Sequence, residues 1–513
     1  MSFLAQTSTT TTGVNFPNLV CTCLVWSALL LALVVLVMRD ETREQRARIK
    51  SLGVAGASIA LFFAVWAVES QVADVALGTG GRPGGDLVEQ HSWLAAFPIT
   101  SSYHLDADGL GLAVILLTAV VFFCAMLAAW RNERRVKLLT VCLLTLETAS
   151  LGVLCAYDWV LFLLFWTLPI APIYLLVRGF GQGEQSRAAA RYAAGALLST
   201  ALLAVAAVLI AFQSGALSFD MGTTPVSLPK ADDVVAFWLI ASASLLAMAI
   251  VPLHGALLDL EEDSTGVLSA VFAAVLPSIG AYALIHVAVG FFPSLAGSYS
   301  LFFAGLAVVA VVWSGLAALR TDDLRRLIGH VGTMLMGLVL LAVAGHTTVA
   351  LTGVMFLLVA RGLGVAVLML LASGLQERTR RVRISQLGGL AWQAPYLSAF
   401  WLVASLTVAG LPLLAGFTGD LLVFTGSFPA HRWATAAVLG GSIMAGGVLV
   451  WTTQRIFLGS SRDTFVRVRD LGPLEITYLG LLVGVILLFG ILPGHFGGLF
   501  QNGAEFILFP AAS

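Results

Sequence analysis

The chain is short of charged residues, and this shortage excludes a large class of proteins. Only 11% of its 513 residues are charged, 59% are hydrophobic, and the mean hydropathy is +0.95. A soluble globular domain carries about 25% charged residues, so this composition excludes one. We therefore expect a lipid bilayer around the chain and no nucleic-acid partner. The net charge of −1 adds nothing further.

Cysteines and cofactor motifs are also scarce. The five cysteines are Cys21, Cys23, Cys124, Cys142 and Cys155. All fall within apolar runs, and they are too sparse for a zinc or iron–sulfur site, so we interpret them as small apolar residues. The sequence has no Walker loop, no glycine fingerprint for a dinucleotide and no pair of haem ligands. We expect no catalytic centre, no metal site and no cofactor held by this chain.

Long apolar runs fill the chain instead. A membrane-spanning helix needs about 20 apolar residues. Fourteen stretches qualify, near residues 16–38, 51–69, 109–130, 136–157, 159–177, 188–212, 234–253, 265–288, 299–319, 326–345, 348–374, 397–427, 433–454 and 474–493. The longest stretch between them, about 70–108, is not a linker between soluble and membrane parts. The sequence predicts an all-α integral membrane protein whose residues 1–513 form a single polytopic domain.

The few charges are placed regularly. With loops numbered by the spans they join, loops 1–2, 3–4, 5–6, 9–10, 11–12 and 13–14 hold 23 of the 27 Lys and Arg residues. The opposite loops hold Arg82, Lys230 and Arg432. Since basic loops stay in the cytoplasm, both termini should lie on the outer side.

Loop 7–8 breaks this pattern, because Asp259, Glu261, Glu262 and Asp263 make it acidic. We expect a solvated loop in which Ser264 or Asp263 caps the following helix. The alternative is a contact with a basic neighbouring subunit.

Two spans carry helix breakers in mid-run. One contains Pro252, and the other contains Gly410, Pro412 and Gly416. Interrupted helices in two halves are typical of transporters built from inverted repeats, although a proline can also merely kink a packed helix. Each break falls in the fourth helix of a five-span set. We therefore predict two inverted five-helix repeats, spans 4–8 (about 136–288) and spans 9–13 (about 299–454), with helices 7 and 12 broken.

Several motifs resemble one known family. Residues 247–280 read AMAIVPLHGALLDLEEDSTGVLSAVFAAVLPSIG, and the third span begins with the Tyr-His-x-Asp-x-Asp-Gly-Leu motif at 103–110. Further motifs are FLLFWTLPIAPIYLL, DDLRRLIGHVGTMLMG, RGLGVAVLML and QLGGLAWQAP. Over about residues 90–465 the chain resembles the antiporter-like membrane subunits of respiratory complex I. GLPLLAGFTGD and the chain end soon after span 14 resemble the M-type subunit (chain 4).

In that family, ionisable residues form a proton path across the middle of the membrane. They comprise glutamates on spans 4 and 5, lysines on spans 7 and 8, a histidine on span 10 and an acid on span 12. Burial and close partners let such groups exchange protons. By this resemblance Glu147 keeps the acid of span 4 and Asp420 that of span 12, while His254 and Asp259 keep the histidine and loop-acid positions.

Other positions of the path have lost their titratable group. Thr167 stands in place of the glutamate of span 5, Ala247 and Ser278 in place of the two lysines, and Leu335 in place of the histidine. His330 replaces a tyrosine, and Arg361 replaces another histidine. None of the four neutral side chains can exchange a proton near pH 7, and arginine does not release its proton.

The remaining charges allow two interpretations each. A charge at the centre of a bilayer costs about 2.5–3.5 kcal/mol, so Arg361 is expected to form a static ion pair with Glu147, Asp420 or both. In the alternative, one of these acids survives as a proton site. His254 and His330 lie near span ends, where a lone histidine usually caps or packs. In the alternative, these two histidines and Asp259 are, with the two acids, candidates for the proton path.

The resemblance therefore implies a bacterial inner-membrane subunit of a proton-translocating, complex I-like assembly. NADH, FMN, iron–sulfur clusters and quinone would belong to partner subunits. The substitutions indicate an impaired proton channel and a structural role. One alternative is a subunit of a Mrp-type cation/proton antiporter, a membrane hydrogenase or a bicarbonate-uptake complex. Another is an autonomous transporter of a small solute, for which His254 and Asp420 would be the chief ligands.

Overall fold

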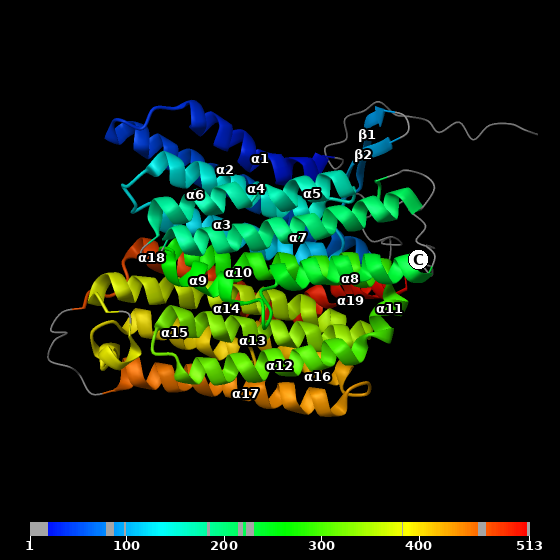
Figure 1. The fold of residues 1–513 in the computed structure, drawn as a ribbon. Helices are drawn as coiled ribbons and strands as arrows, with labels where there is room; N and C mark the ends of the chain where they lie inside the picture. The colour runs from blue at the N-terminus through cyan, green and yellow to red at the C-terminus, as the bar shows by residue number, and fades with distance from the viewer. Residues whose placement is uncertain are drawn as a thin grey trace, which may run out of the picture.

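The computed structural model describes residues 19–77, 87–96, 99–181, 185–213, 219–221, 230–381, 383–459 and 468–509. Three basic residues used in the charge analysis, Arg82, Arg462 and Arg467, lie outside these ranges. The helices run side by side, from α1 and α2 at one edge of the bundle to α17 at the other (Figure 1). The chain is thus a layered bundle of helices with a small hairpin at one end.

The helices and strands follow one another closely along the chain. In order they are α1 (Val20–Val37), α2 (Arg43–Leu77), β1 (Glu89–Ala96), β2 (Ile99–Leu105), α3 (Gly109–Ala129), α4 (Val136–Cys155), α5 (Trp159–Thr167), α6 (Ile170–Phe180), α7 (Gln185–Gln213), α8 (Lys230–Ala247), α9 (Gly255–Asp263), α10 (Gly266–Tyr282), the π-helix η3 (Ala283–Val289), α11 (Pro293–Ser298), α12 (Ser300–Arg320), α13 (Leu324–Gly345), α14 (Thr348–Thr379), α15 (Pro395–Val408), α16 (Ala415–Ser427), α17 (Arg432–Thr453), the π-helix η6 (Gln454–Leu458), α18 (Pro473–Ile491) and α19 (Pro493–Leu508).

The all-helical membrane fold predicted from the sequence is confirmed. Within the described residues, twelve helices are long and apolar enough to cross a bilayer. The predicted span 397–427 corresponds to the interrupted pair α15–α16, whereas the predicted span 234–253 covers α8 and the unwound segment after it, and α9 lies beyond its end. The total of fourteen spans stays a prediction, because α9, α15 and α16 are shorter than a span and α8 carries three charged residues in its first turn.

The interior of the bundle is formed by α10, α13 and α14. Their apolar windows are 100%, 100% and 94% buried, against 33–44% for α7, α12 and α18. Helix α14 packs against α3, α10, α13, α15, α16 and α19. A polar side chain within these buried windows therefore faces protein and not lipid.

The hairpin β1–β2 was missed by the sequence analysis, which treated 70–108 only as a non-spanning stretch. Its strands pair antiparallel from Glu89↔Leu105 to Ala96↔Ile99, with an irregularity between Ser92 and Leu94. The Glu89 carboxylate accepts hydrogen bonds from the Cys21 and Thr22 backbone N–H groups at the start of α1. Contacts from the distant start of α1 thus help to hold this hairpin in place.

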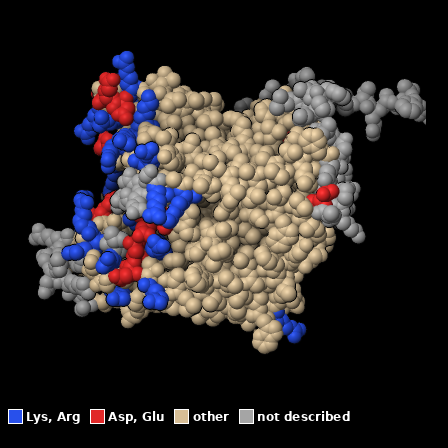
Figure 2. Space-filling view, in the orientation of Figure 1, with Lys and Arg blue, Asp and Glu red and all other residues tan. Residues whose placement is uncertain are grey.

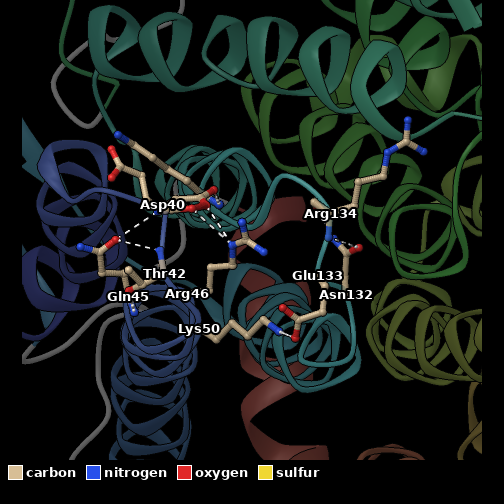
Figure 3. Close-up of polar contacts among 10 residues, drawn as sticks. Asp40, Thr42, Gln45, Arg46, Lys50, Asn132, Glu133 and Arg134 are labelled. Carbon is tan, nitrogen blue, oxygen red and sulfur yellow. Dashed lines mark hydrogen bonds and ion pairs between the residues drawn. The ribbon is translucent and has the colours of Figure 1, made fainter.

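Charged side chains gather at one end of the helices, on the left in Figure 2, and most of the remaining visible face carries none. The α1–α2 and α3–α4 connections meet there, as Figure 3 shows. Lys50 Nζ donates to Glu133 Oε1 at 2.6 Å and to the Trp130 carbonyl at 2.8 Å. Arg46 pairs with Asp40 at 3.2 Å. We refer to this end of the bundle as the charged face.

Candidate functional site

The first helix break lies between α8 and α9. Helix α8 ends at Ala247 and α9 begins at Gly255, and Ala249 adopts a left-handed φ of 52° in the unwound segment that contains Pro252. Gly280 of α10 packs against this segment, so that an added Cβ would lie 2.7 Å from the Ala247 carbonyl carbon. The predicted break at Pro252 is confirmed, and a glycine is needed where α10 meets bare backbone.

The second break lies between α15 and α16. Helix α15 ends at Val408 and α16 begins at Ala415. Gly410 and Leu413 have φ values of 70° and 75° in the segment that includes Pro412. Gly416 packs directly against the Thr407 carbonyl. Both helices predicted to be interrupted are therefore interrupted where the sequence placed their breakers.

Arg361 lies in the middle of α14 and is 3% exposed. Its Nε donates to the Gly332 carbonyl of α13 at 3.3 Å, and its Nη2 donates to the Ala273 carbonyl of α10 at 3.2 Å. Its Nη1 lies 3.5 Å from Ser278 Oγ. The guanidinium thus sits between α10 and α13, beside Ser278.

The expected ion pair of Arg361 with Glu147 or Asp420 is wrong. Neither carboxylate lies within ion-pair distance of any basic group in the described part of the chain. Carbonyl oxygens of α10 and α13 satisfy the guanidinium instead. Because an arginine side chain has five donors in a fixed fork, it can bind several backbone acceptors that a sequence pattern does not reveal.

Apart from the 3.5 Å approach of Arg361 to Ser278, the four neutral positions contact backbone or mainly apolar neighbours. Ser278 Oγ donates to the Ala274 carbonyl at 2.7 Å. Thr167 Oγ1 bonds to the Leu163 and Leu164 carbonyls of its own helix α5. Leu335 is buried in α13. Ala247 lines a cavity of about 80 Å³ together with Trp166, Tyr192, Ser199 and other mostly apolar residues. Ala247, which by the resemblance stands in place of a lysine, therefore faces a mainly apolar cavity.

Glu147 and Asp420, the two acids expected on spans 4 and 12, lie in separate surroundings. Glu147 of α4 is fully buried, and neither of its oxygens has a hydrogen-bond partner among the described residues. Asp420 of α16 is 9% exposed, and its Oδ1 is buried without a hydrogen-bond partner in the described structure. Its carboxylate packs against Gly410, so it lies directly at the break of helix 12.

His254 and His330 face each other across α9 and α13, with ring centroids 6.0 Å apart. Nδ1 of each ring is buried without a hydrogen-bond partner in the described structure. His254 occupies the N-cap position of α9 but its side chain makes no capping bond there. Capping is therefore excluded for His254, whereas packing and a place on the proton path both stay predictions for these histidines.

The acidic stretch 259–263 is not a solvated loop. It belongs to helix α9, the second half of the interrupted helix. Asp259 pairs with Arg191 and lies 3.9 Å from Arg326, which also binds Glu262 at 2.7 Å. Arginines of the neighbouring helices α7 and α13 thus compensate the acids, which explains how this connection departs from the charge pattern.

The expected cap of the next helix is also wrong. Thr265 is the N-cap residue of α10 and makes no side-chain capping bond. Ser264 Oγ donates backward to the Leu260 carbonyl at 2.6 Å. The reason is that α9 continues to Asp263, so Ser264 serves the end of α9 and not the beginning of α10.

Sequence reasoning missed a polar cluster at the end of the bundle opposite the charged face. Asp108 caps α3 by accepting from the Gly111 N–H at 2.6 Å, and its other oxygen lies 3.0 Å from His286 Nδ1 in η3. The ring of Tyr157 packs between those of His286 and His104, with centroids 5.0 and 5.6 Å away. Two features of the sequence could have revealed this cluster. One is Asp108, a capping residue type directly before the Gly-Leu start of α3, and the other is His286, a lone histidine within an apolar run.

Asp106 belongs to the same cluster and precedes α3. Burial raises the pKa of its carboxyl from 3.8 to about 6. Its Oδ1 accepts from the Ala107 N–H at 2.7 Å. Asp106 is therefore a carboxyl outside the spanning segments that changes charge close to neutral pH.

Comparison with known protein families identifies the chain at the level of a family. The family described as "NADH:quinone oxidoreductase/Mrp antiporter, TM" matches residues 156–445. "NAD(P)H-quinone oxidoreductase chain 4 1" of Synechococcus sp. (strain JA-3-3Ab) is 30% identical over 395 residues, which cover 77% of this chain and 74% of that protein. "NADH-quinone oxidoreductase subunit M" of Rickettsia prowazekii (strain Madrid E) is 25% identical over 431 residues, which cover 82% and 86%.

Solved structures share the fold. A chain of respiratory complex I from Thermus thermophilus with bound NADH superposes with a TM-score of 0.82 at 24% identity, covering 95% of this chain and 99% of that one. A chain of the Mrp complex from Dietzia sp. DQ12-45-1b superposes with the same TM-score at 19% identity, covering 96% and 98%. At these identities the match establishes the arrangement of the helices.

Proposed function

Because the chain belongs to the NADH:quinone oxidoreductase/Mrp antiporter family of membrane subunits, we propose that it is a membrane-arm subunit of a complex I-like assembly whose own proton path is interrupted. Its role is then structural, as a spacer between other membrane subunits. NADH, FMN, iron–sulfur clusters and quinone belong to partner subunits in this proposal. The names of its relatives, quinone oxidoreductase chain 4 and subunit M, support it.

The observation that carries the proposal is the position of Arg361. A lysine at the centre of such a path takes up and releases a proton, whereas a guanidinium keeps its proton at any physiological pH. Arg361 reaches Ser278 and the carbonyls of α10 and α13, so it fills the place of the missing amine with a fixed charge. A fixed cation repels a second proton and cannot pass one on.

The surroundings of Ala247 support the same conclusion. A proton hops through water only where polar groups hold that water. The cavity beside Ala247 is lined mainly by apolar side chains, among them Leu246, Leu253 and Leu276. Thr167, in place of the glutamate of span 5, is turned back onto its own helix. The first half of the chain thus lacks both members of the acid–amine pair.

Proton pumping in vesicles tests the proposal. The intact complex is purified with this chain, reconstituted, and assayed for protons moved per electron in wild type, Glu147→Gln and Asp420→Asn. If the path is interrupted, removing either retained acid leaves that ratio unchanged. Glu505→Gln is the matched control, because Glu505 is an exposed carboxylate on α19.

Loss of coupled pumping in Glu147→Gln or Asp420→Asn would contradict the interrupted path. This holds when the complex assembles fully and Glu505→Gln pumps normally. A drop in all three variants would instead report general damage to assembly, which gel filtration of the complex detects independently.

We extend the proposal to repeats and orientation. The halves 136–288 and 299–454 are proposed to be inverted repeats, and the break of the fourth helix in each supports this. The charged face is proposed to lie in the cytoplasm of a bacterial cell, since positively charged loops remain on that side. Both termini would then lie on the outer side. Protease treatment of sealed cells and inverted vesicles checks this orientation.

A second candidate is a subunit of a Mrp-type cation/proton antiporter. The fold matches chains of complex I and of the Mrp complex with equal TM-scores, so the fold alone does not distinguish this candidate from the first. Purification in mild detergent, with partners identified by mass spectrometry, distinguishes them. Flavin and iron–sulfur proteins among the partners support the first proposal, and small membrane subunits without redox proteins support the second.

A further inference from the structure

Glu261 is a buried carboxylate that the proposed function does not use. It lies on α9, is 3% exposed, and its Oε2 has no hydrogen-bond partner among the described residues. The carboxylate packs against Gly329 of α13, where an added Cβ would collide with it. A buried, ionised carboxylate without a compensating charge costs several kcal/mol. Such a group is therefore either kept neutral by a bound proton or compensated by a positive charge nearby.

Two helices place Arg361 about one turn away from Glu261. On α10, Ser269 Oγ donates to the Glu261 carbonyl at 2.7 Å, and the Ala273 carbonyl accepts from Arg361 at 3.2 Å. Residues 269 and 273 are one turn apart, a rise of about 6 Å.

Helix α13 gives the same spacing independently. Gly329 faces the Glu261 carboxylate, and the Gly332 carbonyl accepts from Arg361 Nε at 3.3 Å. These glycines are three residues apart, so they lie on one face of the helix. Because neither has a side chain, both charged groups can lie against the helix backbone.

The two side chains carry opposite charges and reach the same face of α13. Glu147 and Asp420, the two acids expected to balance the arginine, lie on α4 and α16 and make no ion pair with it among the described residues. In a low-dielectric interior, opposite charges one helical turn apart attract appreciably without a direct hydrogen bond.

We propose that Glu261 is the counter-charge of Arg361. The pair keeps the interior of the bundle electrically neutral and holds α9, the second half of the interrupted helix, against α10, α13 and α14. Glu261 is thus a positioning residue for the fixed cation. The pair concerns the folding of this chain, so it would stand even if the proton path proved open.

A double-mutant cycle on the full chain in mild detergent tests the pair. The apparent melting temperature is measured for Glu261→Gln, Arg361→Met and the double variant. Each single change leaves one buried charge uncompensated, so each lowers the melting temperature, by at least about 3 °C. The double variant removes both charges and recovers most of the loss, to within about 2 °C of wild type.

A second cycle serves as the control. Glu147→Gln combined with Arg361→Met should show additive shifts, because Glu147 is buried without a charge acting on it. Arg361→Lys keeps a cation and should lie closer to wild type than Arg361→Met does. If the shifts of Glu261→Gln and Arg361→Met simply add, Glu261 is not the counter-charge and the proposal is overturned.

Poor accumulation of the variants does not remove the test. If the single variants fail to accumulate in the membrane, the amount of folded double variant decides. Recovery of folded chain in the double variant supports the pair, and a yield below that of both single variants overturns it.

Discussion

Replacing Gly280 with alanine should loosen the packing of α10 onto the break of helix 7. The added Cβ would lie 2.7 Å from the Ala247 carbonyl carbon and 2.9 Å from the Met248 Cα, and would also press on the Met248 nitrogen. These neighbours are all backbone atoms, which cannot rotate away as a side chain can. The unwound segment and α10 therefore have to move apart.

The expected change in the free energy of unfolding follows from two opposing effects. Forcing an extra carbon into a packed interior costs about 1–3 kcal/mol. Alanine in place of glycine within a helix returns about 0.5–1 kcal/mol. We therefore expect Gly280→Ala to lower the free energy of unfolding by about 1–2 kcal/mol, since the steric term is the larger.

The assay is the apparent melting temperature of the purified chain, followed by intrinsic tryptophan fluorescence. Gly305→Ala is the matched control, because Gly305 is exposed on α12 and an added Cβ meets nothing within 4 Å. The control should be as stable as wild type or slightly more stable. If Gly280→Ala melts together with Gly305→Ala, α10 does not press on the break as described.

Three further predictions concern polar groups outside or at the ends of the spans. Because burial raises the pKa of Asp106 to about 6, the folded state binds its proton more tightly than the unfolded chain does. The stability of wild type relative to Asp106→Asn should then fall as the pH rises from about 4 to about 6, by up to about 3 kcal/mol, and a flat difference across thermal melts in that range would contradict this. Glu475→Gln should lower the melting temperature, because Glu475 is 7% exposed and binds Arg378 at 2.7 Å. Glu133→Gln should leave the melting temperature unchanged, because the Glu133 side chain that pairs with Lys50 is exposed. Asp108→Ala removes both the cap of α3 and the partner of His286, so it should cost about 1–2 kcal/mol in denaturant melts, and an unchanged midpoint would exclude both contributions.

The position of the helix breaks could be predicted because breakers act locally. Pro252 and Pro412 remove backbone donors wherever they stand in a helix. The structure interrupts the helices at these residues. The long apolar spans could be predicted for a similar reason, since a run of apolar residues of spanning length buries itself in lipid regardless of its neighbours.

The polar contacts of the site could not be predicted in the same way. Arg361 was expected to bind acids, yet it binds carbonyls of α10 and α13. Glu261 was expected to be solvated, yet it is buried. In both cases the outcome depends on which helix lies alongside, and a charge pattern read along one chain does not contain that information.

The sequence by itself determined the membrane class, the apolar spans, the two interrupted helices and the loss of titratable groups at Thr167, Ala247, Ser278 and Leu335. The first three follow from residue type and from neighbours along the chain, and the last follows from the resemblance to the family. Only the tertiary structure decided that Arg361 reaches Ser278, a residue 83 positions away, and that the Glu261 carboxylate is buried against Gly329 of α13. Such contacts form where separate helices meet, and their geometry is set by the packing of the whole bundle.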